Sequence, residues 1–240
     1  MEPTQEEDSA LGTVKNRLAF FDYSASNTNS AQDTNNSAQS AISLAAGETV
    51  MLGTCGLAES AFTGDTYLRL YNPSSAQVAS NDDSESCGPD SLGSKLVYTA
   101  PAAGLYTLRA GCFDVGTCSG TVALSRRKAT YAVPSLSNTN NATINTFNKQ
   151  YYFNGGEVLR VSTCGANAHG ATASGDTVLR IFQQSNGNYT TQVASNDNPG
   201  ALCGTAAEVV YSVPSAGYYQ VRVGCAANTA CSATVAVYTE

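Results

Sequence analysis

The chain has 240 residues, of which 42% are hydrophobic and only 13% are charged, with a formal net charge of −7 at pH 7. Its 12 lysine and arginine residues are scattered, whereas binding to a phosphate backbone requires them to cluster, so a nucleic-acid partner is excluded. No apolar run approaches the roughly 20 residues that a transmembrane helix needs. The length suits two domains of roughly 110 residues, each with a modest core.

The first predicted element is a flexible leader over residues 1–17. Its first nine residues are mostly polar and acidic, which is typical of the tether that remains after a secretion or lipoprotein signal is removed. We therefore expect Met1 to stand in place of such a signal, and a lipid anchor at the N-terminus of the native precursor. Finding Met1 on the natively secreted protein by mass spectrometry would contradict this expectation.

The rest of the sequence repeats itself once, at an offset of about 110 residues, which is the size of a whole domain. We predict two homologous domains, repeat one over residues 18–127 and repeat two over residues 128–240. The basic residues Arg126–Lys128 fall at this boundary, and we interpret Arg126–Thr130 as a short solvated linker. The matching blocks are Thr54–Gly56 with Thr163–Gly165, Gly64–Thr66 with Gly175–Thr177, Val78–Asp82 with Val193–Asp197, Ala100–Tyr106 with Val213–Tyr219, and Gly111–Cys112 with Gly224–Cys225.

Each repeat reads as a series of short strands bounded by turns. An ordered polar loop over residues 24–40 follows the first strand and contains a Ser-Asn-Thr-Asn sequence that recurs in repeat two. No segment shows sustained 3.6-residue periodicity, so the sequence predicts an all-β fold of two tandem antiparallel β-sandwich domains, jelly-roll-like, each with two disulfides. The strands expected in repeat one, each with a counterpart in repeat two, are Leu18–Tyr23, Thr49–Leu52, Thr66–Tyr71, Ala76–Ser80, Lys95–Thr99, Gly104–Ala110 and Thr121–Ser125.

The eight cysteines divide evenly between the repeats, at matching positions. Even numbers repeated in register indicate two disulfides per domain and an oxidising compartment, so we predict a secreted or outer-cell-surface protein. Zinc is disfavoured because the chain has one histidine, His169, and no closely spaced cysteine pairs of the zinc-binding type. We expect bonds between Cys112 and Cys118 and between Cys225 and Cys231 across hairpins. Elimination then leaves Cys55 with Cys87 and Cys164 with Cys203, and the sequence leaves other connectivities open.

The block Ala100–Leu108 predicts a structural tyrosine. Its proline ends one strand, its glycine supplies an unusual backbone angle, and Tyr106 begins the next strand. A tyrosine at this place can cover the end of the sandwich and hydrogen-bond through its hydroxyl. We interpret the block as a folding signature and not as a source of chemistry.

Four blocks in the same order in both repeats resemble the bacterial pre-peptidase C-terminal (PPC) domain family. The resemblance implies a β-sandwich appended to secreted hydrolases, often stabilised by calcium and often used to bind polymers. The two disulfides per repeat and the lack of a catalytic domain depart from that pattern. The blocks are Gly64–Tyr71, Val78–Asp83, Leu96–Thr99 and Ala100–Leu108 in repeat one, and Gly175–Phe182, Val193–Asn198, Val209–Ser212 and Val213–Val221 in repeat two.

Acidic and amide side chains in the turns are the candidate calcium ligands, because Ca²⁺ takes about six to eight oxygens from carboxylates, amides and carbonyls. They converge if the two loops of a repeat lie at the same end of its sandwich. Repeat two has fewer carboxylates, so we expect the weaker site there. The alternative is that these residues only form Asx-type turns and caps. The candidate set is Asp65, Asn81, Asp82 and Asp83 in repeat one, and Asp176, Asn196 and Asp197 in repeat two.

Catalytic groups are sparse, and we predict that the protein is not an enzyme. A Ser-His-Asp arrangement would have to use His169, which has no match in repeat one, and the carboxylates cluster in turns. Some of the 13 tyrosines are candidate sugar-binding platforms, with half-buried packing as the alternative: Tyr67, Tyr71, Tyr151, Tyr152, Tyr189, Tyr218 and Tyr219. Tyr151 and Tyr152 are specific to repeat two, because the corresponding residues around Ser43 are small.

The sequence therefore favours a non-catalytic binding or adhesion module of the cell surface or extracellular space, stabilised by calcium. The expected partner is an extracellular polymer, a glycan or a surface protein. One alternative is a self-assembling structural subunit that pairs with copies of itself through strand edges. Another is a pair of accessory domains of a secreted hydrolase.

Overall fold

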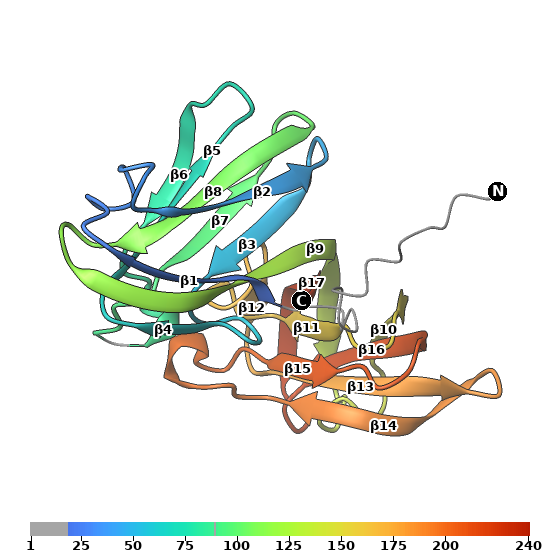
Figure 1. Ribbon diagram of the computed structural model, residues 1–240. Helices are drawn as coiled ribbons and strands as arrows, with labels where there is room; N and C mark the ends of the chain where they lie inside the picture. The colour runs from blue at the N-terminus through green and yellow to red at the C-terminus, as the bar shows by residue number, and fades with distance from the viewer. Residues whose placement is uncertain (1–18, 89) are drawn as a thin grey trace, which may run out of the picture.

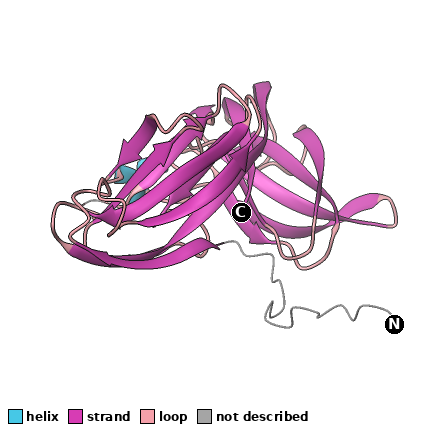
Figure 2. Cartoon of the chain, turned by 45° about the horizontal axis from the view of Figure 1, so that its top comes forward, coloured by secondary structure: helices cyan, strands magenta, loops and turns pink. Residues whose placement is uncertain are grey.

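The structure, a computed structural model, describes residues 19–88 and 90–240. The predicted leader over residues 1–17, with its expected anchor, lies outside the described residues. The described chain is all-β: antiparallel strands are joined by turns, with two single-turn 3₁₀ helices, η1 (Glu85–Cys87) and η2 (Ala201–Cys203) (Figure 2). The prediction of an antiparallel all-β chain is confirmed. Within these described ranges, no helix is long and apolar enough to cross a membrane.

The strands of the two repeats follow one another in matching order (Figure 1). Repeat one contains β1 (Ala19–Ser26), β2 (Ala38–Leu44), β3 (Thr49–Gly53), β4 (Ala61–Thr63), β5 (Thr66–Tyr71), β6 (Gln77–Asn81), β7 (Lys95–Thr99) and β8 (Gly104–Cys112). Strand β9 (Thr117–Ser137) belongs to both repeats. Repeat two contains β10 (Phe147–Phe153), β11 (Val158–Ser162), β12 (Thr172–Ser174), β13 (Thr177–Ser185), β14 (Asn188–Asn196), β15 (Glu208–Ser212), β16 (Gly217–Cys225) and β17 (Ala230–Thr239).

Each repeat contributes one four-stranded sheet, and the two sheets have corresponding strand orders, β2-β8-β5-β6 and β10-β16-β13-β14. Apolar residues alternate along these strands, as Leu68 and Leu70 do in β5, and their side chains are fully buried. One buried cluster draws its residues from repeat one and another from repeat two. The duplication seen in the sequence therefore produces two separate cores.

The prediction that Arg126–Thr130 form a solvated linker is wrong, because these residues lie inside β9, a continuous strand of 21 residues. The first part of β9 pairs with β1, β3 and β4 of repeat one, and its last part pairs with β17 of repeat two. Arg126 has a partner on both sides, Val50 in β3 and Thr239 in β17. Hydrogen-bonding partners are available along the whole segment, so the backbone stays extended where the sequence changes from one repeat to the next.

The shared strand creates one nine-stranded sheet, in which β15-β11-β17-β9-β3-β7 form the main path. A third buried cluster lies on the face of this sheet that points away from the two cores. It includes Met51 and Ala123 from repeat one and Ala236 and Tyr238 from repeat two. The two halves therefore pack directly against each other, and the C-terminus lies between them (Figure 1).

All four expected disulfides are present, which confirms the predicted pairing. Their Cα–Cα distances of 5.2–5.5 Å are usual for this bond, and the described part of the chain has no free cysteine. The bonds are Cys55–Cys87, Cys112–Cys118, Cys164–Cys203 and Cys225–Cys231.

Two further repeated motifs prove to be structural. The hydroxyl of Thr54, in the Thr-Cys-Gly block, lies 3.0 Å from that of Thr66 in the Gly-Asp-Thr block, and both threonines are fully buried. The Ser-Asn-Thr-Asn loop is ordered as predicted, because Thr28 donates to the carbonyl of Cys112 and accepts from its N–H. Repeat two reproduces both arrangements. These motifs close loops onto the core and the disulfides.

The structural tyrosine is confirmed in both repeats. Tyr106 and Tyr219 are buried in the two cores, and their hydroxyls donate to the carbonyls of Ala102 and Ser215 at 2.9 and 3.0 Å. Each acceptor lies in the turn just before the tyrosine's own strand. The hydroxyl thereby satisfies a turn carbonyl while the ring packs into the core.

Candidate functional site

The Gly-Asp-Thr turns place one aspartate at the same point of each repeat. Gly64 and Gly175 have φ angles of +74° and +80°, and a Cβ there would lie 2.5 Å from a backbone oxygen of the neighbouring strand. Glycine is thus required for this close approach. Asp65 and Asp176 follow directly, and in each of them Oδ1 is buried and has no hydrogen-bond partner among the residues that the structure describes. An orphan carboxylate oxygen recurring in both repeats is the structural feature that fits a cation best.

The structure brings the other repeat-one candidates near Asp65. Burial raises the pKa of Asp65, and the negative charges of Asp83 and Asp82 raise it further. Asn81 and Asp82 also make structural hydrogen bonds: Asn81 Oδ1 accepts from the Lys95 N–H at 2.8 Å, and Asp82 Oδ1 accepts from the Asp83 N–H at 2.8 Å. These contacts match the Asx-turn alternative. No group of three or more His, Cys, Asp or Glu side chains within residues 19–88 and 90–240 is arranged to hold a metal ion.

In repeat two, Asn196 and Asp197 line a separate hollow of about 330 Å³. Asp176 is not among its lining residues, whereas Arg180 is. The Arg180 guanidinium donates to the carbonyl of Asn141 and to the side chain of Gln192. A fixed guanidinium opposes the entry of a second cation, so repeat two is the poorer candidate for calcium.

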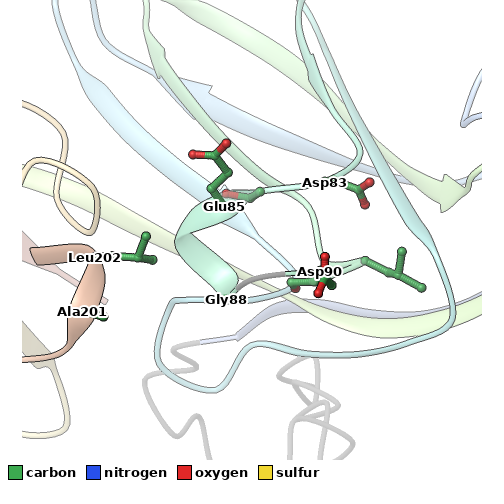
Figure 3. A pocket seen from close by; sticks show the side chains of 9 residues that line it. Asp83, Glu85, Gly88, Asp90, Ala201 and Leu202 are labelled. Carbon is green, nitrogen blue, oxygen red and sulfur yellow. The ribbon is translucent and has the colours of Figure 1, made fainter.

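A hollow with acidic lining lies between the two repeats, beside the two 3₁₀ helices, and we call it the junction pocket (Figure 3). Its volume is about 790 Å³. Both helices end at a disulfide cysteine, Cys87 or Cys203, so the two walls are tied to their own repeats. The lining consists of Asp83, Ser84, Glu85, Gly88, Asp90, Ser91 and Leu92 from repeat one, and Ala201 and Leu202 from repeat two.

The junction pocket combines negative charge with apolar surface. Asp83, Glu85 and Asp90 supply three carboxylates, and Leu92 and Leu202 are 45% and 51% exposed. Figure 3 shows the carboxylates of Asp83 and Glu85 pointing in different directions, spread over the lining. This arrangement suits an extended ligand with several positive groups and apolar stems better than a single ion.

A smaller hollow of about 360 Å³ adjoins the junction pocket and shares Asp83, Glu85 and Leu202 with it. It is also lined by Lys95, which is only 8% exposed. Burial lowers the Lys95 pKa to about 8, assisted by Arg160 and opposed by Glu208 and Glu240. Its ammonium donates to the carbonyl of Asn167, in repeat two, at 3.0 Å. The floor of this region is therefore a polar contact between the repeats.

The candidate tyrosines divide into packed and exposed rings. Tyr151 packs against the core of repeat two, in agreement with the packing alternative. Tyr67 and Tyr71 are covered by Arg69 and Arg109, whose guanidinium carbons lie 4.5 and 4.1 Å from the ring centroids. Tyr152 and Tyr218 remain exposed on the outer face of β10 and β16.

Sequence reasoning missed Leu92 and Leu202 as pocket residues. The available signal was an apolar residue in an otherwise polar loop, with Leu202 directly before Cys203. That signal cannot show that the two loops face one pocket, because they are over 100 positions apart in the chain. Their proximity follows from the shared strand β9 and the packing of the two halves.

Comparisons with known proteins identify no family. No protein-family model matches the chain, and no curated protein matches it. Among solved structures, a putative secreted protein from Eubacterium rectale superposes with a TM-score of 0.28 at 10% identity, over 91% of this chain and 73% of that chain. The CBM22-1–CBM22-2 tandem domain from Paenibacillus barcinonensis Xyn10C superposes with a TM-score of 0.29 at 11% identity, over 83% of this chain and 82% of that chain. Both superpositions are loose, and neither bears on what this chain binds.

Proposed function

We propose that this chain is a non-catalytic extracellular binding module, built of two PPC-like β-sandwich domains, that holds a basic segment of a surface protein or polymer in the junction pocket. The observation that carries the proposal is the pocket itself, in which three carboxylates and two exposed leucines come from loops of both repeats. The four disulfides support an oxidising, extracellular location.

The chemistry of the lining defines the ligand. Lysine and arginine side chains have apolar stems and positive heads, so the stems can cover Leu92 and Leu202 while the heads meet the carboxylates. The walls are restrained by the Cys55–Cys87 and Cys164–Cys203 disulfides. Restrained walls reduce the entropy lost on binding.

The test is calorimetric titration with a short peptide that alternates arginine and leucine. We expect saturable binding that weakens as salt is added, because the contacts are charged and partly exposed. The triple variant Asp83→Asn/Glu85→Gln/Asp90→Asn should weaken binding about tenfold or more. Leu202→Ser should weaken it less, since it removes apolar contact alone.

The matched control is Asp114→Asn, which removes one exposed carboxylate from a loop that does not line the pocket. It should bind like the parent protein, as the net charge changes by only one unit. A second control is the same peptide with glutamate in place of arginine, which should not bind. Equal binding by the triple variant and the parent, or no binding of the arginine peptide, would overturn the proposal.

We also propose that calcium, where it binds, does so at Asp65. The orphan Oδ1 and the raised pKa of this carboxyl favour a cation, with Asp82 and Asp83 as neighbouring carboxylates. Asp176 has the same orphan oxygen, but Asn196 and Asp197 line a hollow that contains Arg180 and does not include Asp176. Repeat one is therefore the proposed site.

Thermal unfolding of the non-reduced protein, in calcium and then in EGTA, tests this site. Binding to the native state raises the melting temperature by mass action. The rise should disappear in Asp82→Ala and Asp65→Asn and persist in Asp197→Ala. Without calcium, Asp65→Asn should itself melt higher, because it relieves repulsion among three carboxylates. A melting temperature that calcium does not change would assign Asn81–Asp83 to a purely structural turn.

A further inference from the structure

The outer face of the sheet β10-β16-β13-β14 is the second surface with ligand-like chemistry. In β10, Phe153 points into the core while Tyr152, Gln150 and Asn148 alternate outward. The register places Tyr152 opposite Tyr218, Gln150 opposite Gln220 and Asn148 opposite Arg222. Aromatic, amide and guanidinium groups thus lie in adjacent rows on one face.

Two exposed rings form the centre of this face. Tyr152 and Tyr218 are 46% and 49% exposed, and their ring centroids are 5.4 Å apart in an edge-to-face arrangement. Large aromatic side chains gain by burial, and the edge-to-face contact offsets only part of the exposed area. Two adjacent exposed rings on a regular sheet are therefore available to a ligand.

The neighbouring side chains are held in place by one another. The Arg222 guanidinium stacks 3.7 Å from the centroid of Phe182 and donates to Gln220 and to the carbonyl of Tyr189, both at 2.7 Å. Gln184 donates to the Tyr189 hydroxyl at 3.2 Å. Burial raises the pKa of Tyr189, and the proximity of Tyr218 raises it further, so this third ring lies near the exposed pair. The surface is ordered before any ligand arrives.

The charge of this sheet differs from that of the whole chain. Its four strands contain Lys149, Arg180 and Arg222 and no aspartate or glutamate, although the chain carries a net charge of −7. The four strands therefore present no carboxylate of their own that would repel an acidic polymer. It is unsuited to the basic ligand proposed for the junction pocket.

From these features we infer that this face, which we call the tyrosine face, binds the pyranose units of an extracellular polysaccharide. The C–H faces of a pyranose ring pack on Tyr152 and Tyr218, and its hydroxyls hydrogen-bond to the amides of Gln150 and Gln184. The polymer is either neutral or rich in uronic acids. This site is independent of the junction pocket, because the two share no residue.

Repeat one lacks this surface. The positions that correspond to Tyr152 and Tyr218 are Ser43 and Leu105, which face each other in β2 and β8. The counterparts of Gln150 and Gln220 are Ala41 and Thr107. The tyrosine face is thus a property of repeat two alone, and repeat one supplies a matched control within the same molecule.

Affinity electrophoresis tests the inference, with the full chain run through gels containing hydroxyethylcellulose, xylan or polygalacturonate. We expect at least one polymer to retard the protein. Tyr152→Ala and Tyr218→Ala should each weaken binding about tenfold. Tyr152→Phe should retain most of the binding, because the ring remains. Retardation by polygalacturonate alone, reduced in Arg222→Gln, would identify the uronic-acid class.

The controls distinguish binding at the tyrosine face from binding elsewhere on the molecule. Leu105→Ala should bind like the parent protein, and the melting temperatures of the tyrosine variants should stay close to the parent's because both rings are on the surface. The junction-pocket variant Asp83→Asn/Glu85→Gln/Asp90→Asn should keep its polysaccharide binding, so failure of either proposal leaves the other intact. The inference is overturned if none of the three polymers retards the protein, or if both alanine variants bind as the parent does.

Discussion

The two repeats differ most where they touch each other. At equivalent positions in the two ends of the nine-stranded sheet, repeat one has Met51 and Lys95, and repeat two has Arg160 and Glu208. Arg160 donates to Glu208 at 2.7 Å, to Glu240, and to the Gly56 carbonyl of repeat one at 3.1 Å. The two surfaces are therefore complementary and not identical, which allows one copy to dock on the other.

The cores show the opposite behaviour. The buried threonine pairs and the hydroxyl contacts of Tyr106 and Tyr219 recur with nearly the same geometry, and the disulfides join the same positions in both repeats. Internal positions make the same interactions in both repeats, whereas positions on the surfaces differ between them. Each repeat contributes one end of the nine-stranded sheet to the contact between the halves, and the other sheet of repeat two carries the tyrosine face.

The largest expected effect tests the equivalence of the cores. Tyr106→Ala and Tyr219→Ala should each lower the free energy of unfolding by about 4–5 kcal/mol, because each leaves a large cavity and a turn carbonyl without its partner. Denaturant unfolding followed by circular dichroism measures the change. Since β9 belongs to both repeats, we expect one transition for each variant; two separate transitions would show that the repeats unfold independently.

The four disulfides allow the stability contributed by long-span and short-span bonds to be compared within one repeat and between the two repeats. The Cys55–Cys87 and Cys164–Cys203 bonds span 32 and 39 residues, and the Cys112–Cys118 and Cys225–Cys231 bonds span 6. Closing a longer loop removes more entropy from the unfolded chain.

Replacing both cysteines of a long-span bond by alanine should therefore cost about 4 kcal/mol, against about 2 kcal/mol for a short-span bond, with similar values in both repeats. Thermal unfolding of the four double variants checks this order. A larger loss from a short-span variant would point to native-state packing as the main contribution of that bond.

Replacing Arg160 by the residue of repeat one tests the docking interface. Arg160 is buried, and Glu208 and Glu240 outweigh the effect of burial, so its pKa is raised. Arg160→Met leaves two buried carboxylates without their cation and should cost about 3 kcal/mol. The combined variant Arg160→Met/Glu208→Gln should recover part of that loss. A single variant as stable as the parent in denaturant unfolding would mean that the ion pairs contribute nothing to docking.

The buried Lys95 should make the free energy of unfolding depend on pH, and this effect is smaller than the preceding ones. Its pKa falls from 10.5 in the unfolded chain to about 8 in the folded protein, so between these values the unfolded state binds more protons. The free energy of unfolding should therefore rise from pH 8 to pH 10, by roughly 1–3 kcal/mol. Above pH 10 the buried Tyr238, whose pKa is raised to about 12, should reverse the trend.

The measurement for Lys95 is denaturant unfolding at intervals of half a pH unit. Lys95→Met, which places in repeat one a neutral side chain of similar length, should abolish the rise between pH 8 and pH 10. Lys149→Met, at an exposed lysine of repeat two, should preserve it. A rise that persists in Lys95→Met would assign the titration to another group.

The sequence by itself indicated the duplication, the all-β class and two disulfides in each repeat, and it left the pairing of the cysteines open. These properties depend on local patterns: alternating side chains specify strands, turn residues separate them, and cysteines matched in both copies indicate disulfides. It also named Asp65 and Asn81–Asp83 as one candidate set, on the condition that their loops lie at the same end of the sandwich. Their use as calcium ligands stays a prediction.

Only the tertiary structure decided that Arg126–Thr130 is a strand, that Lys95 lies near Arg160 and Glu208, and that the loops holding Leu92 and Leu202 enclose one pocket. It likewise separated the packed Tyr151 from the exposed Tyr152. The physical reason is that burial and hydrogen bonding between distant segments depend on how the two halves pack. A local pattern fixes which way a side chain points from its strand, but the packing of the halves fixes what it meets there.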